Sequence, residues 1–402
     1  MKLAILADDF TGALDTSVQF SSQGISTVLT SVDQPWTSMP DNCEVLTMDL
    51  QTRHLPPTDV YRRVYRAAEK LRQKNVPYLY IKTDSGMRGN VGAALAAAAD
   101  CWKSSVYFVP AYPKTGRTVV DGALYVDGKP VSESVFGEDL FNPVRHDRIA
   151  DIIAEQTRMP VVEKWQPEGA IVLRNASTNE DMKRLASEMT PEVRLMAGCA
   201  GLAHYLPDKL QIPVGKLPEV TLHQPLLVIS GSTSKVSLDQ LRYCEEKGFH
   251  SILLSDILAP EPNFKALVQQ VMEKRHSGVL LEVIRSEEEC ARLNQEAERS
   301  GLNAVQASER IASNLGKAAA SVVNAGFRGV LFVFGGDTLA CVLRELKTRR
   351  IEPLCEIESG VVVSEVFRDD GSLFVISKSG SFGGLDVVKN VCRKCSMGVF
   401  AQ

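Results

Sequence analysis

The sequence lacks any apolar run long enough to cross a bilayer, and neither sign of charge dominates it. A membrane-spanning helix needs roughly 20 consecutive apolar residues, whereas the N-terminal apolar run, Met1–Leu6, meets Asp8 too soon even for a signal peptide. Lys and Arg total 45 against 49 Asp and Glu, a net charge of −4, and nucleic-acid-binding domains are strongly basic. We therefore predict a cytoplasmic protein that binds neither a membrane nor nucleic acid.

Several common catalytic motifs are also absent. None of the six histidines lies in an H-E-x-x-H pattern and no G-x-S-x-G segment occurs, which argues against zinc-dependent and serine hydrolysis. No G-x-G-x-x-G follows an expected strand, so a dinucleotide site is unsupported. Residues 230–237 include Lys235 but not the complete frame of a P-loop.

The nine cysteines are scattered and odd in number, which is typical of reduced residues. Cys341 and Cys355 lie in apolar surroundings, and we expect them to be small core residues. Cys392 and Cys395 have the spacing of a zinc or redox pair, but no second pair or nearby histidine completes a site. The favoured interpretation is a coincidence of spacing.

What the chain does contain is an alternation of short apolar runs and helical patterns, and at 402 residues it is too long for one compact core. We predict an α/β fold with two domains, each a mostly parallel sheet flanked by helices, and an active site in the cleft between them. The proline-rich segment "LPDKLQIPVGKLPEVTLHQP" interrupts the alternation. The domains are expected at 1–213 and 225–402, joined by a linker at 214–224. The expected strands are 2–6, 45–48, 78–81, 106–109, 170–173, 226–229, 251–254, 278–282, 329–334 and 373–376. The expected helices are 60–74, 91–101, 236–247, 263–274, 308–325 and 338–347.

Three expected strands of the second half end in glycine- and serine-rich turns. Glycine lets backbone N–H groups approach a ligand, and the start of the following helix favours an anion. Each turn alone is best explained as a plain strand–helix connection, but three on one domain indicate a polyphosphate site. The candidate residues are Ser230, Gly231, Ser232, Gly335, Gly336, Asp337, Thr338, Ser379 and Gly380.

The first half carries charged side chains at strand ends instead. Arginine can grip a carboxylate with two hydrogen bonds, lysine supplies a point charge, and aspartate accepts from hydroxyls, so the set suits a small oxygen-rich anion. A lone arginine here would be a solvated surface charge, Lys82 with Asp84 could be a salt bridge, and Asp8 with Asp9 could be a turn and a helix cap. The candidate residues are Asp8, Asp9, Thr11, Arg53, Lys82, Thr83, Asp84, Ser85, Arg88 and Arg117, with Lys114 nearby.

Six short motifs in order resemble those of the four-carbon acid sugar kinase family, over nearly the whole chain. They are Asp8-Asp-Phe-Thr-Gly-Ala, Lys82-Thr-Asp-Ser with Arg88-Gly-Asn, Gly116-Arg-Thr, Ser230-Gly-Ser, Gly335-Gly-Asp-Thr and Lys378-Ser-Gly-Ser-Phe-Gly. The resemblance implies a sugar-acid-binding N-terminal domain and an ATP-binding C-terminal domain. It also implies transfer of the γ-phosphoryl group to the terminal hydroxyl of threonate, erythronate or 3-oxo-tetronate. Under it, Asp8, Asp9, Arg53 and residues 82–85 line the acid pocket, and residues 230–232, 335–338 and Gly380 line the nucleotide site.

The sequence departs from the family pattern in two places. Gly86-Met87 stands where the family usually has Thr-Leu, beside the expected acid pocket, and this bears on the choice of substrate. Residues 359–363 read Ser-Gly-Val-Val-Val in place of a Pro-Gly-Val-Pro-like segment, which affects a loop of the nucleotide domain.

The expected mechanism is positioning and charge neutralisation rather than covalent chemistry. We expect Arg53, Lys82 and Arg88 to hold the acid, Asp84 or Asp9 to orient the attacking hydroxyl and accept its proton, and Asp337 to hold Mg²⁺ directly or through water. A two-lobed sensor without catalysis and an ATP-dependent acid-activating ligase remain alternatives. A homodimer is the usual prior for the oligomeric state.

Overall fold

The computed structural model describes residues 1–31, 42–139, 142–217, 220–222, 225–378 and 382–395. The chain divides into two compact units, Met1–Leu217 and Pro218–Gln402. Their boundary falls inside residues 214–224. The proline-rich segment begins earlier, within the first unit, where Leu206–Lys209 form the short helix α7 and Leu206 and Pro207 are buried.

The first unit is built on a parallel sheet whose strands lie in the order β2-β3-β1-β4-β11-β5-β10-β9. Its central strand, β1, has the sequence LAILA and is buried along its whole length. Strands covered on both faces read as continuous apolar runs, because no side chain meets water. The strands are β1 (Leu3–Ala7), β2 (Thr27–Ser31), β3 (Val45–Asp49), β4 (Tyr78–Lys82), β5 (Val106–Val109), β9 (Val161–Val162), β10 (Ile171–Leu173) and β11 (Leu195–Gly198).

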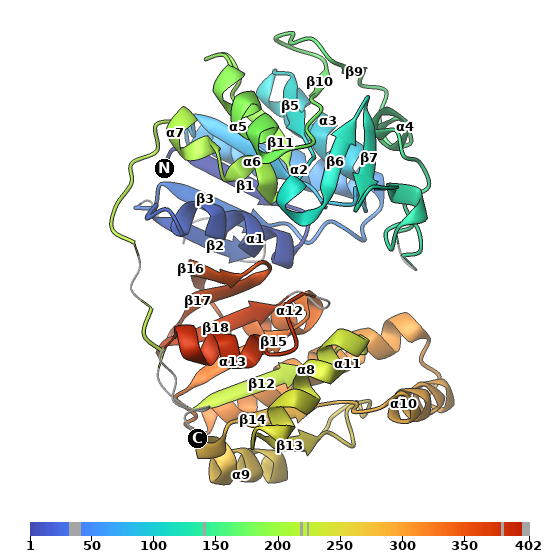
Figure 1. The fold of residues 1–402 in the computed structure, drawn as a ribbon, viewed down its shortest axis with the longest axis vertical. Coiled ribbons are helices and arrows are strands. Elements are labelled where there is room, and N and C mark those ends of the chain that lie inside the picture. The colour runs from blue at the N-terminus through green and yellow to red at the C-terminus, as the bar shows by residue number, and fades with distance from the viewer. Residues whose placement is uncertain (32–41, 140–141, 218–219, 223–224, 379–381, 396–402) are drawn as a thin grey trace. The chain divides into compact units, whose positions relative to one another are not determined.

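Helices cover both faces of this sheet (Figure 1). On one face α2 packs against α3, and on the other α1 packs against α6. The alanine-rich α3 is almost entirely buried, whereas the charged α2 buries only one stripe, as expected of a helix at the surface. The helices are α1 (Phe10–Ser21), α2 (Pro57–Gln73), α3 (Val91–Trp102), α4 (Ile149–Ala154), α5 (Asn179–Glu188) and α6 (Ala200–Ala203), together with α7.

A small antiparallel sheet, β6-β7-β8, accompanies the main sheet of the first unit. Its strands are β6 (Arg117–Val120), β7 (Ala123–Val126) and β8 (Lys129–Pro130). An isolated bridge between Val119 and Ala176 joins it to the segment after β10. This sheet fixes the position of Arg117, which is the first residue of β6.

The second unit also has a mostly parallel sheet, in the order β13-β14-β12-β15-β18-β17-β16. Strands β13, β14, β12, β15 and β18 are parallel, and β17 and β16 continue the sheet as an antiparallel hairpin. The strands are β12 (Leu226–Ser230), β13 (His250–Leu253), β14 (Val279–Glu282), β15 (Val330–Phe334), β16 (Arg350–Glu358), β17 (Val361–Arg368) and β18 (Gly371–Lys378).

The helices of the second unit form two groups (Figure 1). Helix α8, which follows β12, packs against α13. Helix α12, which follows β15, packs against α11, and helices α9 and α10 also pack against α11. The helices that leave the neighbouring strands β12 and β15 therefore belong to different layers. The helices are α8 (Lys235–Glu246), α9 (Lys265–Lys274), α10 (Glu287–Arg299), α11 (Ala304–Asn324), α12 (Gly336–Glu345) and α13 (Val387–Lys394).

The fold class and every element predicted from the sequence are confirmed, with boundaries that differ by a few residues. The structure adds strands that were not predicted, chiefly β2, β11, the β6–β8 sheet and the hairpin of β16 and β17. Residues 359–363, which depart from the family pattern, include the turn of that hairpin, where Gly360 has φ +73°. Among the described residues, no helix is long and apolar enough to cross a membrane.

Candidate functional site

The charged residues of the first unit gather at the carboxyl end of β1. In the sheet register Ala7, the last residue of β1, lies between Asp49 of β3 and Lys82 of β4. The helix after β1 packs in one layer, and the helices after β3 and β4 pack in the other. Such a reversal of strand order opens a crevice at the carboxyl ends of the strands, where α/β proteins bind ligands.

Arg53 is the centre of this group of charges. Its Nε lies 2.8 Å from Asp8 Oδ2, its Nη1 lies 2.7 Å from Asp9 Oδ2, and its Nη2 lies 3.4 Å from Asp84 Oδ1. Burial lowers the pKa of the guanidinium, but the three carboxylates outweigh that effect and raise its pKa well above the ordinary value. Arg53 is therefore a fixed cation whose donors are directed at aspartates of the protein itself.

Arg88 makes a second set of contacts with Asp84. Two of its nitrogens donate to Asp84 at 2.9 and 3.1 Å, and a third donates to Asp139 at 2.9 Å. The backbone nitrogens of Gly86 and Arg88 also donate to Asp84 Oδ2. Burial raises the pKa of Asp84, but the nearby cations Arg53, Arg88 and Lys82 lower it by more than burial raises it. The pKa of Asp84 therefore lies well below the ordinary value. Asp84 is therefore charged at neutral pH and bridges Arg53 and Arg88.

Asp9 caps helix α1, as its sequence position suggested, and it also pairs with Arg53. Its Oδ1 accepts from Gly12 N at 2.9 Å and caps α1, while its Oδ2 accepts from Arg53. The cap and the site are close together, because a Cβ added at Gly12 would lie 2.6 Å from both Asp9 Oδ1 and Lys82 Nζ. Glycine at position 12 thus lets the first turn of α1 approach the charged side chains.

Lys82 and Thr83 leave β4 as buried residues. Lys82 Nζ donates to the backbone oxygen of Thr83 at 2.7 Å, which uses one of its three hydrogens. Thr83 Oγ1 is buried and, in the part of the chain that the structure describes, has no hydrogen-bond partner. Two further predicted residues, Ser85 after β4 and Thr11 in the first turn of α1, are partly exposed. Buried polar atoms in proteins are normally paired, so Thr83 Oγ1 is a candidate ligand-binding group.

Arg117 lies near Arg88, because both guanidinium groups pack against the ring of Phe136. The guanidinium of Arg88 lies 5.1 Å and that of Arg117 5.5 Å from the centre of this phenyl ring. Arg117 Nη1 donates to the backbone oxygen of Thr115, and its Nε is buried without a partner among the described residues. Unlike Arg53 and Arg88, Arg117 makes no ion pair with a carboxylate in the described parts of the chain, so its Nε is a donor that it can offer to a ligand.

Two carboxyl groups of this cluster have raised pKa values. Burial raises the pKa of Asp8, with Arg53 opposing and Asp9 adding to the effect, and Asp8 Oδ1 has no partner within the described residues. Burial also raises the pKa of Asp49 to about 7, although Gln51 N donates to it at 3.1 Å. Asp49 was not predicted as a site residue. Its place as the last residue of β3, beside the strand that precedes Asp8, is the signal that could have found it.

In the second unit, the turns after β12 and β15 meet. A Cβ added at Gly231 would lie 3.2 Å from Thr338 Oγ1 and 2.8 Å from Leu315 of α11. Ser230 and Thr338 are buried, and Ser232 N donates to Ser230 Oγ. Gly335, with φ +97°, is the cap residue before α12, which begins at Gly336. Because the helices after β12 and β15 lie in different layers, these turns stand at the second reversal of strand order and can offer backbone N–H groups to an anion.

The third glycine turn, after β18, is held from inside by two residues that were not predicted. Gln240 of α8 donates from Nε2 to the backbone oxygens of Phe382, Gly383 and Gly384, at 3.2, 2.9 and 3.0 Å. Lys378 Nζ also donates to Phe382 O, and burial lowers the pKa of this lysine to about 8. Ser379 and Gly380, two predicted nucleotide-binding residues, lie outside the described residues. Gln240 could be found only from the fold, since nothing in its sequence surroundings indicates a ligand site.

Asp337, the predicted metal ligand, is an exposed residue in the first turn of α12. Among the described residues, no group of three or more His, Cys, Asp or Glu side chains could hold a metal ion. A single carboxylate is consistent with Mg²⁺, which usually takes one or two carboxylates and completes its shell with phosphate oxygens and water.

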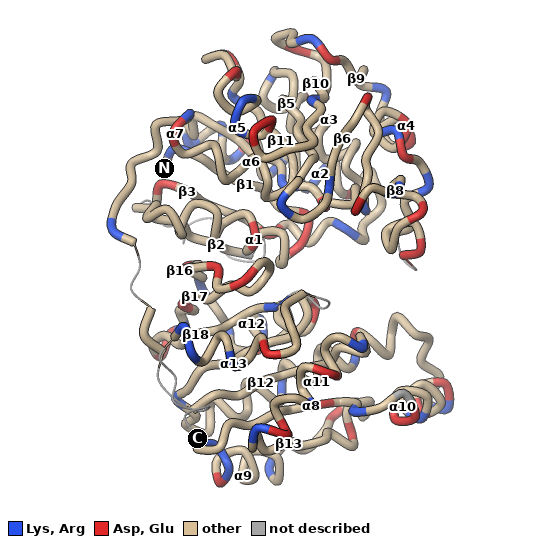
Figure 2. The backbone as a smooth tube through the Cα atoms, viewed as in Figure 1, with Lys and Arg blue, Asp and Glu red and all other residues tan. Residues whose placement is uncertain are grey.

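Basic and acidic residues are interspersed along the backbone of both units (Figure 2). All nine cysteines are free. Cys392 on α13 and Cys395, the residue that follows this helix, are buried, whereas Cys341 and Cys355, expected in the core, are only half-buried. The expectation for these two was therefore wrong: Cys341 lies on the partly exposed side of α12, and Cys355 lies at a β-bulge of β16.

Comparison with known proteins identifies the class of protein. The model of a sugar-binding N-terminal domain matches residues 3–206, and the model of a nucleotide-binding C-terminal domain matches residues 227–388. The chain belongs to the four-carbon acid sugar kinase family. The predicted enzyme class, a phosphotransferase that acts on an alcohol group, is confirmed with it.

Relatives of known activity share about a quarter of their residues with the chain. A D-threonate kinase of Salmonella typhimurium is 28% identical, with 95% of this chain and 96% of the relative covered. A 3-oxo-tetronate kinase of Pseudomonas savastanoi is 26% identical, with 96% and 95% covered. A D-erythronate kinase of Heliobacterium modesticaldum is 26% identical, with 96% and 94% covered.

Solved structures share the fold at lower identity. A Haemophilus influenzae protein has a TM-score of 0.77 at 22% identity, covering 98% of this chain and all of its own. A Salmonella typhimurium protein has a TM-score of 0.81 at 21% identity, covering 98% of this chain and 99% of its own.

Proposed function

We propose that the protein transfers the γ-phosphoryl group of ATP to the terminal hydroxyl of a four-carbon sugar acid, of the class of D-threonate, D-erythronate or 3-oxo-tetronate. The observation that carries this proposal is the pairing of two different sites in one chain. One is a cluster of charged side chains at the carboxyl end of β1, and the other is a set of backbone turns at the ends of β12 and β15. The named activities of the relatives supply the substrate class.

The acid is proposed to bind through groups whose hydrogen-bonding capacity the protein leaves unused. Arg53 and Arg88 were expected to hold the substrate carboxylate, but their donors are occupied by Asp8, Asp9, Asp84 and Asp139. Arg117 Nε and Thr83 Oγ1 are buried and have no hydrogen-bond partner within the described ranges. We assign the carboxylate to Arg117, and a substrate hydroxyl to Thr83, because leaving such groups unpaired costs about 1–3 kcal/mol each.

The proton of the attacking hydroxyl is assigned to Asp8. Asp84 is held by arginines that lower its pKa, which makes it a poor proton acceptor, and both oxygens of Asp9 are already engaged. Asp8 keeps one oxygen that has no partner among the residues the structure describes, and burial raises its pKa. Lys82 has hydrogens left to stabilise the charge of the phosphoryl group in transfer.

The nucleotide is proposed to be ATP, with its phosphates on the turns that contain Ser230–Ser232 and Gly335–Thr338. The close approach at Gly231, where a side chain would collide with Leu315, fits a backbone cradle for phosphate. Asp337 would hold Mg²⁺, which neutralises phosphate charge when bound. Ser379 and Gly380 remain predicted members of this site.

A single assay tests the proposal. The protein is incubated with ATP, Mg²⁺ and each of D-threonate, D-erythronate, 3-oxo-tetronate and their epimers, while ADP and AMP are measured and the product is located by phosphorus NMR. We expect ADP and a phosphate ester at the terminal carbon with at least one acid. Formation of AMP would identify an acid-activating ligase, and binding of acid and ATP without turnover would identify a sensor.

A further inference from the structure

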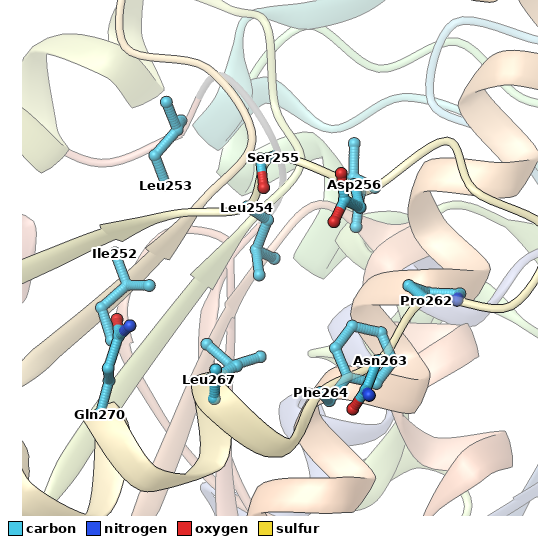
Figure 3. A pocket seen from close by; sticks show the side chains of 12 residues that line it. Ile252, Leu253, Leu254, Ser255, Asp256, Pro262, Asn263, Phe264, Leu267 and Gln270 are labelled. Atoms are coloured by element: carbon cyan, nitrogen blue, oxygen red, sulfur yellow. The ribbon is translucent and has the colours of Figure 1, made fainter.

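A cavity of about 190 Å³ lies in the second unit, beyond the carboxyl end of β13 (Figure 3). The loop that follows β13 forms one side of it, and the start of α9 forms the other. None of the site residues predicted from the sequence is among the residues that line this cavity. A site for a whole small molecule measures roughly 300–1,000 Å³, so this space suits one part of a larger ligand, such as a single ring system.

The cavity opens at the same edge of the sheet as the phosphate-binding turns. Strands β13, β14 and β12 are parallel neighbours, so their carboxyl ends lie together. Two strand spacings, roughly 9–10 Å, separate the end of β13 from the turn at Gly231. A nucleotide whose phosphates lie on that turn has its base at about this separation.

Helix α11 ties the cavity and the turn together. Asn314 Nδ2 donates to the backbone oxygens of Ile257 and Ala259, at 2.6 and 2.9 Å, which holds the loop after β13 against the helix. The next residue of the same helix, Leu315, is the one that a Cβ at Gly231 would meet. One turn of α11 thus fixes the cavity wall relative to the phosphate turn.

The lining suits a flat heteroaromatic ring. Leu254, Phe264 and Leu267 supply apolar surface, and Asp256 and Asn263 supply polar groups at the rim (Figure 3). Asn263 Oδ1 already accepts from Lys265 N, so the amide nitrogen is the group that this side chain can offer to a ligand. A purine has apolar faces, ring nitrogens that accept and an exocyclic amine that donates, which matches a donor amide beside an acceptor carboxylate.

We propose that this cavity binds the adenine ring of the nucleotide, with Leu254, Phe264 and Leu267 against the faces of the ring and Asn263 and Asp256 at its polar edge. The inference rests on the proposed function, since it takes the ligand of the neighbouring turns to be ATP. It assigns the base to the β13–α9 segment, where no sequence motif indicates a ligand.

The test fills the cavity and compares ligands with and without a base. Ala266 lines the cavity and is exposed, so Ala266→Trp adds bulk there without replacing a core residue. Gln269→Trp, on the exposed surface of the same helix and outside the cavity, is the matched control. Binding of ADP and of inorganic tripolyphosphate to the full chain is measured by calorimetry. We expect Ala266→Trp to weaken ADP at least tenfold and leave tripolyphosphate unchanged, and Gln269→Trp to change neither.

Two results overturn the proposal: unchanged ADP binding in Ala266→Trp, or equal weakening of ADP and tripolyphosphate, which would show a general distortion of the unit. A second variant, Asn263→Ala, checks the polar edge and is expected to reduce the preference for ADP over GDP at least threefold; an unchanged preference contradicts the role of Asn263. These measurements need no acid and no turnover. If the unmodified protein binds ADP as expected but phosphorylates no acid, the kinase proposal fails while the base site stands.

Discussion

The two candidate sites are built from different materials. At the end of β1 the working groups are side chains, and ion pairs among Arg53, Arg88 and aspartates hold them in place. At the ends of β12 and β15 the candidate ligand-binding groups are backbone amides. Their conformation depends on glycine, because a side chain at Gly231 would collide with its neighbours and Gly335 has a positive φ. The first site can be altered by changing charge, whereas the second responds to changes of shape and of backbone support.

The largest expected effect separates these two kinds of site by removing a charge. Asp8→Asn keeps the hydrogen-bonding shape of the side chain but cannot take a proton. We expect kcat to fall by about 10²–10⁴-fold, the usual range for a lost general base, with the KM for ATP unchanged. Steady-state kinetics with the acid found in the assay panel would measure both.

Asp139→Asn is the matched control, because Asp139 pairs with Arg88 at the outer side of the same network. Its kcat is expected to remain within about threefold of the unmodified protein, the scale of a partly exposed ion pair. If Asp8→Asn keeps its kcat and Asp84→Asn loses it, then the proton acceptor is Asp84 and the assignment to Asp8 is wrong.

A smaller effect is expected from removing support of the backbone site. Gln240→Met keeps the volume of the side chain but takes away the donor to the oxygens of Phe382, Gly383 and Gly384. Because peptide oxygens held inward leave the following N–H groups facing outward, their release should cost nucleotide affinity. We expect the KM for ATP to rise about tenfold, equivalent to roughly one lost hydrogen bond, with kcat nearly unchanged.

The mirror variant lies in the first unit, where Gln156 Nε2 donates to Gly89 O at 3.0 Å, next to Arg88. Gln156→Met should raise the KM for the acid and leave that for ATP alone. The contrast between side-chain and backbone sites breaks down if both glutamine variants shift the same parameter.

The smallest expected effect is on stability rather than catalysis. Burial raises the pKa of Asp49 from 3.8 to about 7, so the folded protein binds this proton more tightly than the unfolded chain does. Its charge therefore lowers stability progressively as pH rises from about 4 to 7. Asp49→Asn should be more stable than the unmodified protein at pH 8, by on the order of 1–3 kcal/mol, and equal to it near pH 4, as measured by urea unfolding.

Asp181→Asn should show the opposite sign. The pKa of Asp181 is lowered to about 2, first by the backbone of Ser177 and then by Arg184, so its charge stabilises the folded state above pH 4. This variant should be less stable at neutral pH, and the difference should disappear as the pH falls toward 2. A stability gain for Asp49→Asn that does not depend on pH would show that burial of charge is not its cause.

The sequence was sufficient for the parts of the fold that repeat a simple pattern. Parallel strands such as Val106–Val109 are continuous apolar runs, and the helices between them have regular periodicity. The hairpin of β16 and β17 was missed because β16, with the sequence RIEPLCEIE, contains charged residues and a proline, which are depleted in strands. Ser359-Gly360, between this segment and the apolar start of β17, is nevertheless a hairpin signal. The continuous apolar strands and the periodic helices between them were enough to predict the fold class.

The sequence could predict which charged residues gather at the end of β1, but not which contacts they make with one another. Motifs at strand ends indicated Asp8, Asp9, Arg53 and Asp84, because the carboxyl ends of parallel strands meet at one edge. No sequence pattern could show that the guanidinium of Arg53 would pair with all three aspartates, because that pairing depends on side-chain geometry between distant segments. The same holds for Gln240, which acts on a turn more than a hundred residues away in the chain.

The neighbourhood of Phe136 limits how this enzyme can be redesigned. A Cβ at Gly86 would lie 2.3 Å from both Cγ and Cδ1 of Phe136, whose ring is the one against which Arg88 and Arg117 both lie. Gly86 and Phe136 are therefore coupled positions: the threonine that the family usually carries at 86 would require the ring to move away from its place against the two arginines. A mutant library meant to change the preferred acid should vary these two positions together, because a side chain at 86 needs the space that Phe136 fills.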